Sequence, residues 1–211
     1  MRARSAEYNR GTCEPTKNML SAYGTGSMSS ERTISLHGTV ISGRGNAKAH
    51  ISAEIDEFEA ATNEKIIPGS LNVILSAPTL FSENTVRACS NGKRLLWPAK
   101  IRDKNVWIYR FPHAPLHVAE ILSDEHLRSR FELKDGDQVH LEVSPDMRVP
   151  MSIRQWCAWQ LIWRGRARWS YHNDLYYFRT RRLSINLGAT QQTSKRRISG
   201  SLWSFLRNGL G

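Results

Sequence analysis

Apolar and polar residues alternate in several short runs of this chain, and these runs predict β-strands. The first covers 34–40, where Ile, Leu, Gly and Val alternate with Ser, His and Thr. Further strands are predicted at 71–75, at 106–111, which is rich in aromatic and β-branched residues, and at 139–143. A period of two sends successive side chains to opposite faces, so we expect strands that are half-buried.

Helical spacing occurs in two segments between these strands. Ile51, Ile55 and Phe58 recur every three or four residues, which predicts one amphipathic helix. A second helix is predicted to begin with Ser123 as its N-cap, to carry two acidic residues in its first turn, and to end before the tight turn at 133–137. Short strands around few, short helices predict a mainly β fold, a small β-barrel with helical insertions.

Composition divides the chain into three parts. Residues 1–32 are rich in Ser, Gly, Thr and Arg without a sustained period, and we predict a disordered leader there. Residues 33–146 hold the predicted strands and form the barrel domain. Residues 147–211 form a basic, Trp- and Arg-rich extension that holds five of the seven tryptophans. The final 30 residues are predicted to be disordered.

The formal net charge of +11 is distributed unevenly along the chain. Residues 37–146 hold 13 basic and 15 acidic residues, whereas 147–211 hold 12 basic residues and the single acid Asp174. The positive charge is therefore a property of the extension and says nothing about what the barrel binds. Because the barrel segment is nearly neutral by itself, we expect it to fold without the extension.

Three interpretations of the extension follow from its tryptophans and arginines. Arginines interleaved with aromatic residues grip phosphates and stack on bases in proteins that bind single-stranded nucleic acid. The spacing of Trp156, Trp159 and Trp163 on one helical face also fits a helix at a membrane surface. The third interpretation, which we favour for 156–163, is that these aromatic residues pack on the barrel and the remainder is a solvated basic arm. Contact of the extension with a polyanion or a membrane surface stays open.

Several protein classes are excluded by the sequence. No apolar run approaches the roughly 18 residues that a membrane-spanning helix needs. The N-terminus lacks the apolar segment of a secretory signal peptide. The three cysteines, Cys13, Cys89 and Cys157, are an odd number and lie far apart, which argues against a disulfide scaffold and a zinc ribbon. We expect a cytoplasmic protein.

Three segments contain residues suited to phosphate and metal chemistry. The glycine-containing loop 43–48 directly follows a predicted strand, where backbone N–H groups can approach a phosphate closely and Lys48 adds charge. Ser70 and Asn72 lie two residues apart at the start of a predicted strand, so both side chains point to one side. Their oxygens are ligands suited to Mg²⁺. In the third segment, 120–137, a helix N-terminus is placed to receive an anion or ribose hydroxyls.

Each segment also has a structural interpretation without chemistry. Loop 43–48 is neither a Walker A loop nor a Rossmann loop, and an ordinary turn is the commoner meaning of two such glycines. The Pro68-Gly69 turn can simply be capped by its own Ser and Asn side chains. His117 is a candidate general base by its location only, and a packed or surface histidine is the favoured interpretation.

Taken in order, these segments resemble the CTP-dependent riboflavin kinase family, best known from archaea. The resemblance covers about residues 34–144 and rests on an ordered set of motifs. They are Ser42-Gly43-Arg44-Gly45-Asn46-Ala47-Lys48, Pro68-Gly69-Ser70-Leu71-Asn72, Glu120-Ile121, Leu127-Arg128 and Leu133-Lys134-Asp135-Gly136-Asp137. It implies a cradle-loop β-barrel that binds CTP, Mg²⁺ and riboflavin, and that produces FMN and CDP.

The resemblance also implies a role for particular residues. Ser70 and Asn72 would hold Mg²⁺, Glu120 would contact the flavin, and Pro112 falls at about the position of a flavin-contacting Thr of the family. The nucleotide would be bound by two sets, Arg44, Gly45, Asn46, Ala47, Lys48 and Ala49 in the first loop, and Glu125, His126, Leu127 and Arg128 later in the chain.

Three departures from the family pattern keep a second interpretation open. Ser70 replaces a Thr but keeps the hydroxyl, and Ala47 replaces a loop glycine. Pro112 offers neither a hydroxyl nor an N–H donor, which bears on flavin binding more than on nucleotide binding. The alternative to a kinase is a non-catalytic module of the same fold that binds nucleotide or flavin and serves regulation or interaction.

Overall fold

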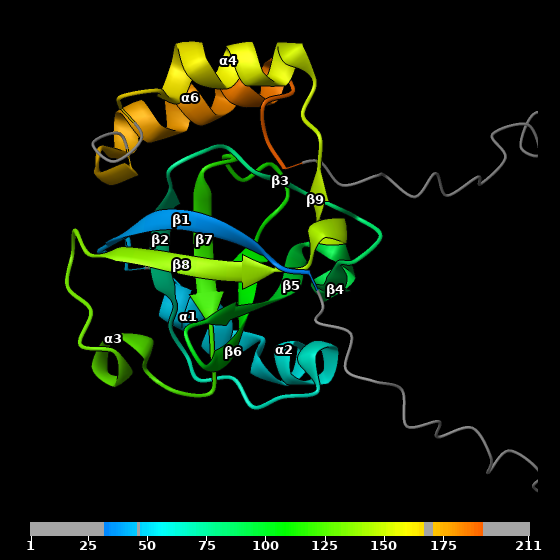
Figure 1. Ribbon diagram of the computed structural model, residues 1–211, viewed down its shortest axis with the longest axis vertical. Coiled ribbons are helices and arrows are strands. Elements are labelled where there is room, and N and C mark those ends of the chain that lie inside the picture. Colours follow the sequence, from blue (N-terminus) through cyan, green and yellow to red (C-terminus); the bar gives the residue numbers. More distant parts are fainter. Residues whose placement is uncertain (1–31, 46, 167–170, 192–211) are drawn as a thin grey trace, which may run out of the picture. The chain divides into compact units, whose positions relative to one another are not determined.

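The computed structural model describes residues 32–45, 47–166 and 171–191 (Figure 1). Within these residues the fold is mainly β and is built on a closed antiparallel barrel of six strands, as the sequence predicts. The barrel strands are β1 (Ile34–Ile41), β2 (Leu71–Leu75), β5 (Arg94–Ile101), β6 (Lys104–Arg110), β7 (Val118–Leu122) and β8 (Gln138–Val143).

The order of the strands is β5-β6-β7-β2-β1-β8, and a pairing of β8 with β5 closes the sheet. The short β4 (Arg87–Cys89) pairs with the free side of β5, and β3 (Leu80–Phe81) pairs with β9 (Arg148–Val149) in a separate two-stranded sheet. Strands β5 and β7 were not predicted from the sequence. Pro98 lies within β5 and interrupts a run that would otherwise indicate a strand.

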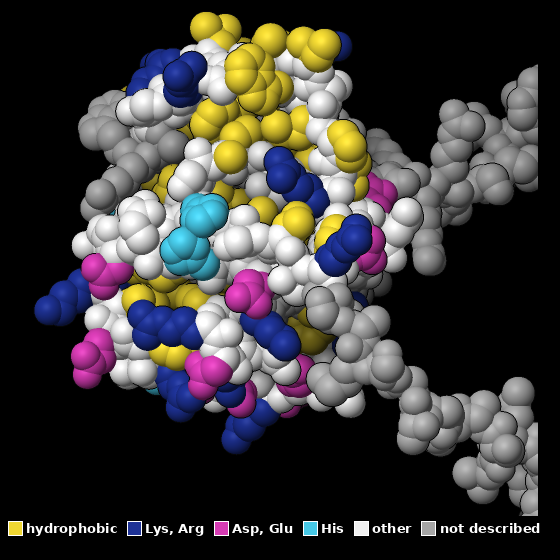
Figure 2. Space-filling model, in the orientation of Figure 1, with side chains coloured by type: hydrophobic (Ala, Val, Ile, Leu, Met, Phe, Trp, Pro, Cys, Tyr) yellow, Lys and Arg dark blue, Asp and Glu magenta, His cyan; other side chains and the backbone are white. Residues whose placement is uncertain are grey.

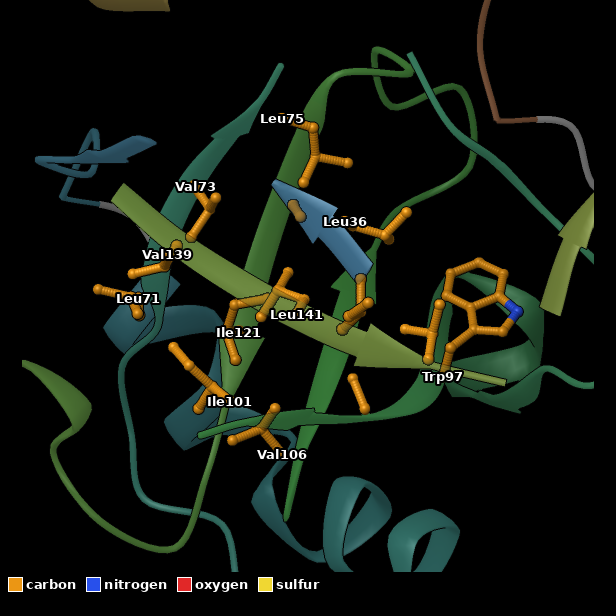
Figure 3. Packing of buried hydrophobic residues seen from close by; sticks show 14 of the residues in the cluster. Leu36, Leu71, Val73, Leu75, Trp97, Ile101, Val106, Ile121, Val139 and Leu141 are labelled. Carbon is orange, nitrogen blue, oxygen red and sulfur yellow. The ribbon is translucent and has the colours of Figure 1, made fainter. Parts of the chain in front are cut away.

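Side chains from all six strands fill the interior of the barrel. Figure 3 shows how they meet between the strands, with Leu36 and Leu141 near the centre and Trp97 at one side. The Trp97 indole is fully buried, and its Nε1 donates to the carbonyl of Ser82 at 2.8 Å. Leu36 and Leu141 are alternating residues of predicted strands, so the period-two pattern selects the interior face there.

The helices of the barrel segment differ from the prediction in two places. The single helix predicted from Ile51, Ile55 and Phe58 is divided at Glu54 into α1 (Ala47–Ala53) and α2 (Ile55–Thr62). Ile51 and Phe58 pack outside the barrel against Trp107. The carboxylate of Glu54 instead pairs with Arg94 at 2.8 Å. The helix predicted from Ser123 is only α3 (Leu127–Arg130), because 123–126 form a turn. The short 3₁₀ helices η1 (Ser90–Gly92) and η2 (Pro145–Met147) complete this segment.

The described part of the extension includes the helices α4 (Ile153–Trp163) and α6 (Asp174–Asn186), which lie together above the barrel in Figure 1. They enclose a second apolar cluster with the outer face of the barrel. It joins Ile41, Ile74, Leu116 and Val118 to Trp159, Ile162, Trp163, Tyr171 and Tyr177. The favoured interpretation is confirmed for two of the tryptophans, whereas Trp156 faces outward and is 48% exposed.

The final described residues are also packed, contrary to the prediction of disorder over the last 30 residues. Helix α6 extends to Asn186, and Gln191 is buried beside Arg110. The buried Arg110 guanidinium donates to the carbonyls of Thr79, Leu116 and Val118 and to Gln191 Oε1. This network ties 189–191 to the barrel. Residues 192–211 and the predicted leader 1–31 lie outside the described residues.

The outward faces of α4 and α6 carry exposed apolar side chains, which gather over these helices in Figure 2. All the large hydrophobic side chains found exposed in the described ranges belong to these two helices: Ile153, Trp156, Leu161, Leu175, Phe178 and Leu183. Among the helices that the structure describes, none is both long and apolar enough to cross a membrane.

The second apolar cluster predicts that the extension stabilises the barrel. Trp163 is fully buried and donates to Ser184 Oγ at 2.7 Å, so Trp163→Ala should lower the free energy of unfolding by about 3–5 kcal/mol. Trp156→Ala in the same helix should change it by less than about 1 kcal/mol. Urea unfolding followed by far-UV circular dichroism measures both. Two separate transitions, with the barrel transition unchanged by Trp163→Ala, would mean that the barrel does not need the extension.

Candidate functional site

Polar side chains of three adjacent strands form a row across the outside of the barrel. Strand register places Glu120 of β7 opposite Tyr109 of β6 on one side and opposite Asn72 of β2 on the other. On the far side of Asn72 lies Ile41, the last residue of β1, from which the glycine-containing loop leaves the barrel. The barrel therefore brings three of the predicted segments side by side.

The glycine-containing loop packs closely on this row. A Cβ added to Gly43 would lie 2.5 Å from Nδ2 of Asn72, which is far below van der Waals contact. A side chain at position 43 would therefore displace the Asn72 amide. Gly45 has a φ of 84°, in the left-handed region that favours glycine. Gly43 is therefore required by its close approach to Asn72, whereas the conformation of Gly45 is one that an ordinary turn also uses.

The Leu-Lys-Asp-Gly-Asp turn holds this loop in position from behind. One oxygen of the Asp135 carboxylate accepts hydrogen bonds from both the backbone N–H and the hydroxyl of Ser42. Its other oxygen pairs with Arg128 at 2.7 Å, and Arg128 also donates to the carbonyl of Ile41 at 2.7 Å. These contacts lower the pKa of the Asp135 carboxyl below its usual value. Three separate sequence motifs are thus joined through one carboxylate.

Two adjoining pockets open on the site. The larger has a volume of about 450 Å³ and contains the polar row together with Gly43, Arg44, Gly45, Ala47 and Lys48. The smaller, about 270 Å³, is bordered by 67–71 and by Ser123 and 125–128. Lys48, Gly69 and Ser70 line both pockets. The border between the pockets is therefore formed by the predicted phosphate lysine and a predicted metal ligand.

The predicted nucleotide residues are divided between these pockets. Glu125, His126, Leu127 and Arg128 all line the smaller pocket, whereas Arg44, Gly45 and Ala47 line only the larger. Lys48 is the member of the described first-loop set that borders both. Ala49 is exposed on α1 and lines neither pocket, and Asn46 lies outside the described residues.

The predicted metal and flavin residues meet, with one exception. Ser70, Asn72 and Glu120 all line the larger pocket, and the Ser70 hydroxyl donates to Glu120 Oε2 at 3.3 Å. Pro112 lies just after β6 and lines neither pocket, although its neighbour Phe111 lines the larger one. The backbone at Pro112 is in a turn beyond the strand end, and this turn directs the position away from the pocket wall.

The Glu120 carboxyl is the ionisable group most changed by its position in the row. Burial raises its pKa to about 7, and the hydrogen bond from Ser70 and the charge of Arg94 only partly oppose this. A carboxyl with such a pKa can accept a proton near neutral pH. Tyr109, its neighbour on β6, has a pKa raised by burial to about 12 and remains protonated.

His117 is not placed to act as a base. It is fully buried in the second apolar cluster, and its Nδ1 accepts a hydrogen bond from Trp159 Nε1 at 3.0 Å. Burial, together with the charge of Arg110, lowers its pKa to about 3, so the imidazole stays neutral. The packed interpretation of His117 is confirmed.

The oxygens at the border of the pockets fit a hard divalent cation. The Ser70 hydroxyl and the Asn72 amide are neutral oxygen donors, and Glu120 adds a carboxylate beside them. The Asn72 Oδ1 accepts a hydrogen bond from the Tyr171 hydroxyl at 3.0 Å, which leaves its second lone pair free. No cluster of three or more His, Cys, Asp or Glu side chains able to hold a metal occurs in the described ranges.

The sequence analysis missed the residues that the extension brings to the larger pocket. They are Tyr171, Tyr177, Phe178 and Arg181. Arg94 of β5 was missed as well, because the segment around it matches no motif. Aromatic and arginine residues are frequent throughout the extension, so their spacing alone gave no signal of which would reach the barrel.

Comparison with known proteins finds no matching family model but several curated relatives. The chain is 33% identical over 131 residues to a riboflavin kinase of Methanospirillum hungatei. This match covers 54% of this chain and 59% of that protein. It is 30% identical to riboflavin kinases of Ignicoccus hospitalis and Saccharolobus solfataricus, over 53% of this chain and 72% and 74% of theirs. The chain thus spans little more than half of the first of these relatives.

The raised pKa of Glu120 predicts a pH dependence of stability that Glu120→Gln should remove. Between the unfolded pKa of 4.5 and the folded pKa of about 7, the unfolded chain loses the proton while the folded chain keeps it. The wild-type protein should therefore lose up to about 3 kcal/mol of stability as the pH rises from 4.5 to 7.5, relative to Glu120→Gln. Urea unfolding at several pH values measures this difference.

Glu142→Gln provides the matched control, because Glu142 is an exposed carboxyl on β8. It should leave the pH dependence of the wild type unchanged. Identical slopes for the wild type and Glu120→Gln would show that the Glu120 carboxyl is not perturbed by its surroundings.

Proposed function

The chain belongs to the riboflavin kinase family, archaeal type, and from this we propose that it transfers the γ-phosphate of CTP to the 5′-hydroxyl of riboflavin, giving FMN and CDP. The observation that carries the proposal is the arrangement of two pockets that share Lys48 and Ser70. A transfer reaction needs a donor and an acceptor that meet at one border, and these residues have the chemistry for a phosphate and its metal.

We assign the donor to the smaller pocket. Its lining includes 125–128, the set that the family resemblance associates with the nucleotide. The Lys48 ammonium, which lines both pockets, would neutralise charge on the β- and γ-phosphates. The choice of CTP over ATP rests on the family resemblance.

We assign Mg²⁺ to the oxygens of Ser70 and Asn72. Held by these two side chains, Mg²⁺ would supply positive charge that reduces the repulsion between the phosphates and the attacking hydroxyl. The protein would supply only part of the coordination shell, which suits an ion that keeps water and takes phosphate oxygens as ligands. Gly43 and Tyr171 would hold the Asn72 amide in place.

We infer that Glu120 accepts the proton of the acceptor hydroxyl. The riboflavin 5′-oxygen forms a bond to the γ-phosphorus, the bond from that phosphorus to the β-γ bridging oxygen breaks, and CDP leaves with the electron pair. The hydroxyl proton would pass to the Glu120 carboxylate, which lines the larger pocket and lies 3.3 Å from Ser70 Oγ at the border with the smaller one. Most of the rate enhancement would come from alignment and charge neutralisation, because the transition state of phosphoryl transfer is loose.

The decisive experiment is incubation of the full chain with Mg²⁺ and riboflavin, with CTP in one sample and ATP in another. We expect FMN, detected by chromatography, with CTP and little or none with ATP. FMN formed with ATP alone would contradict the donor assignment. Flavin binding without FMN from either nucleotide would support the non-catalytic interpretation of the fold.

Ser70→Ala and Asn72→Ala should each lower kcat/KM about 100-fold or more and raise the Mg²⁺ concentration needed for half-maximal rate, because each removes one metal ligand. Ser35→Ala and Asn105→Ala are matched controls on exposed strand positions and should retain full activity. Thermal unfolding verifies that all four variants are folded. Wild-type rates for both site variants at limiting Mg²⁺ would contradict the metal assignment.

Contact of the extension with a polyanion or a membrane surface stays a prediction, as does a cytoplasmic location. The observation that favours a surface contact is the exposed apolar face of α4 and α6, which lies among the arginines of the extension. Apolar side chains flanked by basic ones are typical of helices that rest on anionic membrane surfaces.

A further inference from the structure

Aromatic side chains are concentrated in the larger of the two pockets, and most of them come from the extension. Tyr109 and Phe111 belong to the β6 side of the pocket, whereas Tyr171, Tyr177 and Phe178 come from the extension. The smaller pocket has no Phe, Tyr or Trp in its lining. A flat aromatic ligand is therefore matched by the larger pocket, where rings can stack on it.

The aromatic wall is attached to the first loop through Arg44. The Arg44 guanidinium carbon lies 4.5 Å from the centroid of the Tyr177 ring and 5.0 Å from that of Phe178, within the range of cation–π contact. Arg44 also pairs with Asp174 at the start of α6. Arg44 therefore joins the first loop to helix α6.

A second arginine attaches the wall to the barrel. The guanidinium carbon of Arg181 lies 4.7 Å from the centroid of the Phe111 ring, and its Nε donates to the carbonyl of His113 at 3.3 Å. Helix α6 is thus held to the loop after β1 at one side of the pocket and to the turn after β6 at the other. The pocket wall is continuous between barrel and extension.

Phe178 is the most exposed of the aromatic residues that line the larger pocket. It is 57% exposed although it lines the pocket, whereas Tyr177 next to it is buried in the second apolar cluster. A ligand ring that stacks on an exposed phenyl ring removes more apolar surface from water than one that stacks on a ring already buried. Its exposure also means that its substitution should not disturb folding.

We propose that the extension is part of the acceptor site and that Phe178 contacts the ring system of the acceptor, thereby determining specificity for a planar aromatic compound. This inference rests on the proposed function, because it assigns the flavin to the larger pocket. It gives 171–181 a direct role in binding, beyond the packing that attaches the extension to the barrel.

The test compares binding of the acceptor and of the nucleotide in Phe178→Ala. Loss of one stacking contact should raise the Kd for riboflavin, measured by quenching of its fluorescence, about tenfold. The Kd for CTP with Mg²⁺, measured by calorimetry, should change by less than about twofold. Phe178→Tyr keeps the ring and should restore riboflavin binding to near the wild-type value.

Two further comparisons separate ring recognition from a general effect. Lumichrome, which has the ring system without the ribityl chain, should compete with riboflavin in the wild type and lose affinity in Phe178→Ala to the same extent. Leu175→Ala is the matched control, because Leu175 is 64% exposed on the same helix and lines neither pocket. It should bind both ligands as the wild type does.

An unchanged riboflavin Kd in Phe178→Ala, with a wild type that binds and phosphorylates riboflavin, would overturn this inference and leave the proposed function intact. Equal losses for riboflavin and CTP would also overturn it, because the residue would then act on the whole site. A wild-type chain that binds no riboflavin would overturn the proposed function and, with it, this inference.

Discussion

The pairing of β5 with β8 is the contact on which the remaining structure depends. It joins Ile101 to Leu141 and Lys100 to Glu142, and thereby turns an open sheet into a closed barrel without a free edge among its six strands. Closure curves the sheet around one apolar interior, so that side chains on the opposite face of each strand point outward. The row formed by Tyr109, Glu120 and Asn72 lies on this outer face, where the pairings of β6 with β7 and of β7 with β2 set its register.

The barrel uses buried polar groups in two different ways. Arg110 and His117 are buried with their hydrogen bonds directed to the carbonyls of the barrel, to Gln191 and to Trp159, so they join the extension to the barrel. Glu120 is placed in the pocket wall with only Ser70 as a hydrogen-bond partner at its carboxylate in the described structure, and its pKa rises. Arg110 thus holds the fold through several hydrogen bonds and His117 through one, whereas the carboxylate suited to proton transfer keeps oxygen lone pairs that can accept a proton.

Some residues of the extension pack on the barrel, and others line the larger pocket. Trp159 and Trp163 cover apolar residues on the outer face of the barrel, while Tyr171 and Phe178 lie at the larger pocket. A segment that is packed by tryptophans is held firmly enough to present a pocket wall. The extension differs from the barrel in composition. It nevertheless contributes residues to the larger pocket, so a difference in composition does not show that a segment lies away from the site.

The sequence by itself determined the barrel class of the fold, four of its six strands and most of the candidate site. The alternation in β1 and β8 determined the interior face, and local spacing pointed to Lys48, Ser70 and Asn72, because these patterns act within a few residues. Glu120 was put forward by the family resemblance. Only the tertiary structure decided that Ser123 caps no long helix, that His117 is packed under Trp159, and that Pro112 lies away from the pocket. It also decided that 171–181 reach the site. These outcomes depend on contacts between residues far apart in the chain, such as Tyr171 with Asn72, and no local pattern carries that information.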